Sequence, residues 1–131
     1  MTYSRIKNEI FKSSSTKEKI INALVFVAKT NEKDKELTKM FVFEYMRHYG
    51  SSQDERKSRG LSNILYSLIE DGAIKEDVKS TIDAKKAAQI ISAVYFHSLV
   101  EWLWSQVDYS FSDDISEKID MVFEGIAGER I

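Results

Sequence analysis

The chain has 131 residues, 43% of them hydrophobic and 31% charged, a composition typical of one globular domain with a real hydrophobic core. It contains no cysteine, which excludes disulfides and thiolate metal sites. The formal net charge is −2, and the acidic residues gather in the half from Leu61 to Ile131, which carries thirteen against six basic ones. A phosphate backbone calls for clustered Lys and Arg, so that half is a poor partner for nucleic acid.

No stretch of the sequence predicts export or membrane insertion. The segment Met1 to Lys12 is charged and lacks the apolar core of a signal peptide. The most apolar run, Ile90 to Trp104, is interrupted by His97 and Glu101 and is too short to span a bilayer. We therefore expect a cytoplasmic protein with no membrane partner.

Apolar residues recur at helical spacing through almost the whole chain, and proline is absent. A first helix is expected over Met1 to Phe11. Ser15 and Glu18 predict the start of a second, because the hydroxyl and the carboxylate of a capping box satisfy each other's free backbone N–H groups. This second helix should end near Thr30. A third is expected over about Leu37 to Gly50.

The second half of the chain predicts the remaining helices. The fourth begins near Ser52 and should end at Gly72, since glycine adopts a left-handed C-cap conformation at little cost. Asp83 is a good N-cap for a long helix over Ala84 to Val107, and Ser112 is expected to begin the last one. No strand pattern competes with these spacings, so the sequence predicts an all-α domain of five or six helices.

The long helix carries large apolar side chains on two opposite faces. A helix at the surface of a domain needs only one apolar face. One face here is expected to contain Ala87, Ile91, Val94, Tyr95, Ser98 and Trp102. The other must be covered as well, either by the same chain, with this helix as the central post of a monomer, or by a second copy.

The last helix favours the second copy. It follows a short turn, so it should pack antiparallel to the long helix, and two such helices are half of a four-helix bundle. We therefore expect a homodimer in which the last two helices of each copy form an intersubunit four-helix bundle. The expected interface residues are Ala93, Phe96, Val100, Leu103, Trp104, Ile119, Val122 and Phe123. Which face of the long helix meets the second copy stays open.

Residues with catalytic or metal-binding chemistry are few and scattered. His48 and His97 are the only histidines, and neither has companions at metal-ligand spacing. Glu101 lies one turn after His97 and can pair with it. No Gly-rich phosphate loop, nucleophile elbow or zinc-protease motif is present. The sequence therefore predicts no enzyme, no metal and no cofactor.

Aromatic residues from several predicted helices are the remaining candidates for a binding site. Ligand pockets are mostly apolar, with a few polar groups that orient the ligand. The expected ligand-binding residues are Phe26, Phe41, Tyr45, Tyr66, Tyr95 and Trp102. The alternative for each of them is that the ring fills the hydrophobic core.

Two stretches resemble the C-terminal regulatory domain of the tetracycline-repressor (TetR) family of bacterial transcription regulators. LYSLIEDGAIKEDV, Leu65 to Val78, is similar to the family's helix end, turn and lead into the penultimate helix. DAKKAAQIISAVYFHSLVEWLW, Asp83 to Trp104, is similar to the penultimate helix itself, with an acidic start, an alanine pair and a tryptophan near its end. The order and approximate length of the other expected helices agree with the family, so the likeness covers nearly the whole chain.

The resemblance implies a single regulatory domain over residues 1–131, which dimerises through its last two helices and binds a small-molecule effector among the preceding ones. Binding would release operator DNA from a helix-turn-helix head, which this sequence lacks, so DNA is expected as a partner only through that absent head. Met1 to Phe11 matches only the connector that leads from the head. The alternative is a stand-alone helical dimerisation module that binds a protein partner and no ligand.

Overall fold

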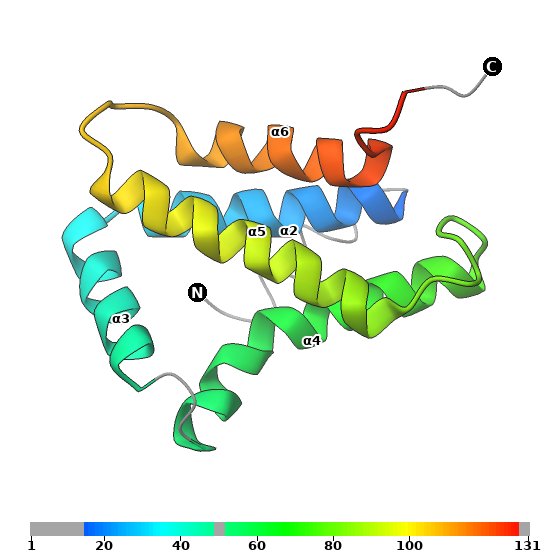
Figure 1. Ribbon diagram of the computed structural model, residues 1–131, viewed down its shortest axis with the longest axis horizontal. Helices are drawn as coiled ribbons and strands as arrows, with labels where there is room; N and C mark the ends of the chain where they lie inside the picture. Colours follow the sequence, from blue (N-terminus) through cyan, green and yellow to red (C-terminus); the bar gives the residue numbers. More distant parts are fainter. Residues whose placement is uncertain (1–14, 49–51, 129–131) are drawn as a thin grey trace.

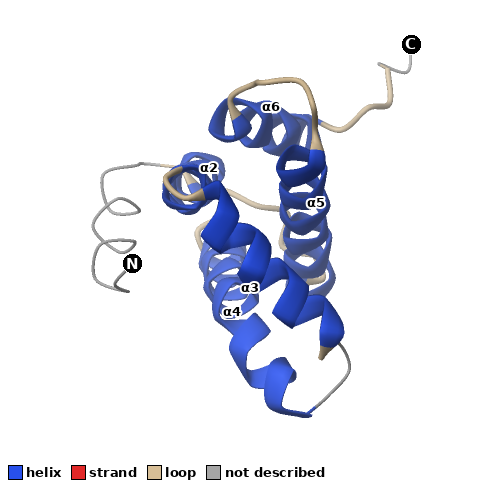
Figure 2. Cartoon of the chain, turned by 90° about the vertical axis from the view of Figure 1, so that its left-hand side faces the viewer, coloured by secondary structure: helices blue, strands red, loops and turns tan. Residues whose placement is uncertain are grey.

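The computed structural model describes residues 15–48 and 52–128, with the backbone alone for 52–59. These residues form the helices α2 (Thr16–Glu32), α3 (Lys35–Arg47), α4 (Ser52–Ile74), α5 (Ala84–Trp104) and α6 (Phe111–Glu124). No strand occurs in the described ranges, so the predicted all-α fold is confirmed (Figure 2). The expected first helix, Met1 to Phe11, lies outside the described residues.

The helices α2, α5 and α6 form the body of the bundle, α4 crosses below it, and α3 extends away at one end (Figure 1). The largest side chains sealed from solvent come from α2, α4, α5 and α6: Ile20, Leu24, Leu65, Leu103, Phe111, Ile115 and Ile119. The core therefore runs along the contact of α2 with α6 and is closed by α4 and α5. No helix of the described chain is long and apolar enough to cross a membrane.

Side-chain caps fix the starts of α2 and α3. The Ser15 hydroxyl accepts a hydrogen bond from the N–H of Glu18 at 3.1 Å, which confirms the hydroxyl half of the predicted capping box. α2 then continues to Glu32, two residues beyond the predicted end. Asp34 caps α3 by accepting from the N–H of Leu37 at 3.0 Å, so a connection of only two residues joins these helices.

The start of α2 is also held by a distant part of the chain. The N–H of Thr16 donates to a carboxylate oxygen of Asp77 at 2.5 Å, and Asp77 lies in the turn between α4 and α5. This backbone hydrogen bond, supported by the Thr16 hydroxyl, lowers the pKa of Asp77 below its ordinary value. The α4–α5 turn therefore supplies a tertiary cap to a helix terminus whose first N–H groups have no partner within the helix.

Gly72 does not end α4, which continues to Ile74. A Cβ atom at Gly72 would collide with the hydroxyl oxygen of Thr16 and lie 2.8 Å from a methyl carbon of Val78. The positive φ angle expected of a C-cap falls instead at Glu76, at 63°. Glycine is therefore required at position 72 by the close approach of α2 and not by a left-handed backbone.

Two glycine-to-alanine substitutions in α4 should shift stability in opposite directions. Gly72→Ala is expected to lower the free energy of unfolding by about 1–3 kcal/mol, because the new methyl group overpacks the contact with Thr16. Gly60→Ala is the matched control: the same helix is open around Gly60, so a gain of about 0.5–1 kcal/mol is expected from helix propensity alone. Urea unfolding followed by circular dichroism measures both. Stabilisation by Gly72→Ala would show that the α2–α4 contact is looser than described.

α5 begins where the sequence predicts and ends earlier. The carboxylate of Asp83 accepts from the N–H of Lys86 at 3.1 Å, which confirms the predicted N-cap. The helix stops at Trp104, three residues before the predicted Val107, because Ser105 has an extended backbone. The indole N–H of Trp102 donates to the carbonyl oxygen of Tyr109 at 3.2 Å and fastens the following turn to the helix.

α6 starts one residue earlier than expected, and its N-cap is Ser110. The Ser110 hydroxyl accepts from the N–H of Asp113 at 3.2 Å. Ser112, the predicted start, lies inside the first turn and is buried, and its N–H donates to the carboxylate of Glu32 at 2.8 Å. A residue at the end of α2 thus helps to hold the beginning of α6.

Candidate interaction site on α5 and α6

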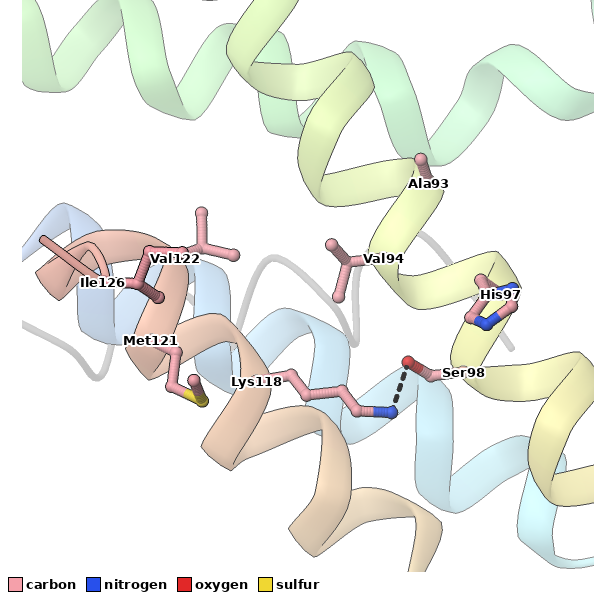
Figure 3. Close-up of a pocket in the computed structure, with 8 residues that line it drawn as sticks. All are labelled: Ala93, Val94, His97, Ser98, Lys118, Met121, Val122 and Ile126. Carbon is pink, nitrogen blue, oxygen red and sulfur yellow. Dashed lines mark hydrogen bonds between the residues drawn. The ribbon is translucent and has the colours of Figure 1, made fainter.

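An apolar groove of about 530 Å³ runs between α5 and α6 on the outside of the bundle. α5 and α6 are antiparallel neighbours joined by the turn at 105–110 (Figure 1). The groove residues come from α5, α6 and the chain just after α6: Ala93, Val94, His97, Ser98, Lys118, Met121, Val122 and Ile126. Figure 3 shows Val94 of α5 pointing toward α6, with Met121 and Val122 on the opposite wall. The walls are therefore mostly aliphatic.

The polar groups in the groove are tied to one another. The ammonium group of Lys118 donates to the Ser98 hydroxyl at 3.0 Å (Figure 3). It also lies 2.8 Å from a carboxylate oxygen of Asp114. Ser98 itself is sealed from solvent. His97 lies at the outer edge, with its Nε2 atom 3.4 Å from the Glu101 carboxylate, as its spacing from Glu101 predicts. The polar atoms thus bridge the two helices or line the rim, and the apolar walls dominate the surface.

Large apolar side chains next to the groove are exposed. Met121 is 55% exposed, Val122 38%, Ile126 88% and Ile90 56%. Scattered apolar residues are normal on a protein surface, but a contiguous set along two neighbouring helices marks an interaction site. The groove with these residues is the candidate interaction site, which we call the α5–α6 face.

Four of the six residues expected on the first face of α5, Ile91, Tyr95, Ser98 and Trp102, are buried. The other two, Ala87 and Val94, are half-buried. Phe111 of α6 joins two of the buried residues: its ring stacks on Trp102 at 5.3 Å with an interplanar angle of 16° and lies 5.5 Å from the ring of Tyr95. This side of α5 is therefore the packed centre of the domain.

The eight residues expected at a dimer interface divide into groups. Ala93, Trp104 and Val122 are exposed, and Ala93 and Val122 belong to the α5–α6 face. Phe96, Val100 and Phe123 are half-buried. Leu103 and Ile119 are fully buried in the core of the same chain, where they can offer little surface to a second copy.

α3 covers part of the α5 surface on which the interface was expected. The ring of Tyr45 lies 5.0 Å from that of Phe96, and the ring of Phe43 meets Trp104 edge-on at 5.4 Å. The ammonium of Lys39 lies 5.7 Å from the centre of the Trp104 ring. The second apolar face of α5 is thus shared between α3 and solvent.

The six expected ligand-binding residues do not gather at one place. Tyr95 and Trp102 are buried in the core beside Phe111. Phe26 packs half-buried against Ala23, as do Ile64 and Leu68 of α4, and Phe41 is 65% exposed on α3. Tyr45 contacts Phe96, as described above, and Tyr66 lines a surface hollow between α4 and α5. The rings thus face different parts of the molecule.

Tyr95 carries a buried hydroxyl group. This oxygen accepts a hydrogen bond from the side-chain amide of Asn31 at 2.6 Å. Burial raises the pKa of Tyr95, because the phenolate form would lose its hydration. Tyr95 is therefore neutral at physiological pH and links α5 to the end of α2.

Several residues of the α5–α6 face escape the sequence reasoning. Val94 shares the first apolar face of α5 in the sequence pattern and yet lines the groove, and the pattern gives Met121, Lys118 and Ile126 no place in a site. Met121 and Val122 are consecutive in α6, so their side chains point in different directions. A search for apolar residues three or four positions apart therefore includes only one of them. The signal that could have identified the groove is the presence of apolar residues on the outward side of both helices.

Within the described ranges there is no group of three or more His, Cys, Asp or Glu side chains that could hold a metal ion. Comparisons with protein-family models, with curated proteins and with solved structures find no match to this chain.

Proposed function

We propose that this chain is a regulatory domain of the tetracycline-repressor type, which forms a homodimer through the α5–α6 face. The observation that supports the dimer is the contiguous apolar groove on two antiparallel helices, whose lining includes the exposed Met121 and Ile126. A second copy placed by a twofold axis would add the same two helices and complete a four-helix bundle. The small side chain at Ala93 and the exposed aliphatic groups on the same surface support a pairing in which each copy inserts its aliphatic groups into the groove of the other.

In this proposal the domain binds a small hydrophobic or aromatic effector. The effector acts by preferring one of two arrangements of the helices, because a ligand shifts an equilibrium only by its differential affinity for the two states. DNA would be bound by a helix-turn-helix head outside this sequence. The likeness of Leu65 to Val78 and Asp83 to Trp104 to the family supports this part of the proposal.

A helical dimerisation module without a ligand is the second candidate. The burial of Tyr95 and Trp102 favours it, because two of the expected ligand-binding side chains fill the core instead of lining a pocket. Both candidates require the dimer. They differ in whether small molecules raise the thermal stability of the dimer.

Light scattering coupled to gel filtration tests the common requirement. We expect a mass of twice the 15.1 kDa of the chain over a wide range of protein concentrations. A mass of one chain at the highest concentration would contradict both candidates. Thermal unfolding against a library of hydrophobic and aromatic compounds then separates them: stabilisation by members of one chemical class supports the regulatory domain, and uniform silence supports the module.

A further inference from the structure

A second cavity, of about 410 Å³, lies beneath the α4–α5 turn. Its walls come from the end of α4, the turn, the start of α5 and the end of α6, and they include Ile69, Val78, Ile91 and Phe123. Figure 1 shows this turn beside the start of α2 and the end of α6. A mostly aliphatic cavity of this size, with few polar groups, has the character of a small-molecule site.

The two charged residues that line the cavity differ in what they already bind. The carboxylate of Asp77 accepts the N–H of Thr16, and the charges of Lys19 and Lys75 act on it favourably. The side chain of Lys79 makes no hydrogen bond or ion pair within the described part of the chain, and it is exposed. The cavity edge therefore carries one carboxylate that is already hydrogen-bonded and one ammonium group that has no partner among the described residues.

We propose that this cavity binds a small aliphatic carboxylate, with the alkyl chain among Ile69, Ile91 and Phe123 and the carboxylate at Lys79. The apolar walls account for the alkyl chain, and the lysine at the edge accounts for the anionic head. The site is separate from the six aromatic residues expected from the sequence. A regulatory role for this site rests on the proposed function, whereas binding of the carboxylate does not.

Titration calorimetry with sodium octanoate tests the proposal. Each methylene buried contributes about 0.8 kcal/mol, so hexanoate should bind about 15-fold more weakly than octanoate. Octylamine, with the same chain and the opposite charge, should bind more weakly than octanoate. Equal affinities for hexanoate and octanoate, tighter binding of octylamine, or no binding of octanoate at all would overturn the proposal.

Two lysine variants locate the carboxylate. Lys79→Met should weaken octanoate binding by about tenfold, the loss expected for one charge-assisted contact at the surface. Lys75→Met is the matched control, because Lys75 lies on the same turn, pairs with Asp71 at 2.9 Å and does not line the cavity. Equal effects of the two variants would contradict the assignment of the carboxylate to Lys79.

Amide chemical-shift mapping on the unmodified chain locates the alkyl chain without relying on any variant. Octanoate should shift the amides of Ile69, Val78 and Phe123, and leave those of α3 unchanged. Ile90 and Val122 line both this cavity and the α5–α6 face, so they do not discriminate. Shifts confined to α3, or to Ala93, His97 and Met121 of the groove, would overturn the proposal. Light scattering tests the proposed function independently of this site. A single-chain mass would contradict the dimer, whereas absent octanoate binding would contradict only the cavity proposal.

Discussion

Phe111→Ala is expected to lower the free energy of unfolding by about 3–5 kcal/mol, a loss comparable to the whole stability of many small domains. Phe111 is fully buried, stacks on Trp102 and contacts Tyr95. Its removal leaves a cavity at the point where the first turn of α6 meets α5, and rigid rings line that cavity and cannot easily collapse into it. Urea unfolding followed by circular dichroism measures the change.

Phe41→Ala is the matched control for this substitution. Phe41 is 65% exposed on α3, so the same truncation should change the free energy of unfolding by no more than about 0.5 kcal/mol. Comparable losses for the two variants would mean that α3 is covered by a part of the protein other than the described residues. A loss below about 1 kcal/mol for Phe111→Ala would show that the centre of the domain lies elsewhere.

Met121→Glu is expected to weaken the dimer by at least about 100-fold in its dissociation constant. Met121 lines the groove and is 55% exposed in the single chain. By twofold symmetry the change buries two carboxylates per dimer in mostly aliphatic surroundings, and an unpaired buried charge costs several kcal/mol. Sedimentation velocity at a series of concentrations measures the dissociation constant.

Met40→Glu makes the same chemical change at a distance from the groove. Met40 is 64% exposed on α3, so its replacement should leave the dissociation constant of the dimer unchanged. An unchanged dimer in Met121→Glu would rule out the α5–α6 face as the interface. If Met40→Glu alone yields single chains, the second copy contacts α3 instead.

The caps that the sequence predicts correctly are those decided by local chemistry. Ser15 and Asp83 each cap a helix whose first turn follows directly in the chain, so residue type and spacing suffice. The sequence predicts the start of α6 at Ser112, whereas the helix begins one residue earlier, because Ser110 and Ser112 are both residue types that cap helices. With Ser110 as the cap, the N–H of Ser112 donates to Glu32, eighty residues earlier in the chain. A local sequence pattern cannot predict a contact at this separation.

The surface of α5 shows a similar limit. Its periodicity predicts two apolar faces and leaves open which of them is covered by the same chain; four of the six residues on the first face are buried, whereas Ala87 and Val94 are half-buried. The periodicity does not reveal that Tyr45 and Phe43 of α3 lie over Phe96 and Trp104, because the direction in which α3 leaves the bundle is set by tertiary packing. The sequence places Leu103 and Ile119 at the interface for the same reason. Helical periodicity groups residues by face, but it does not say how much of each face is covered by other helices of the same chain.

The tertiary cap on α2 has a consequence for whatever precedes Ser15. Because the first amide of α2 is bound by the carboxylate of a residue sixty-one positions later, tilting α2 away from the α4–α5 turn requires this hydrogen bond to break. The close approach of Thr16 to Gly72 adds a second anchor at the same point. A displacement of the α4–α5 turn would therefore be transmitted to the N-terminal end of α2 through these two contacts.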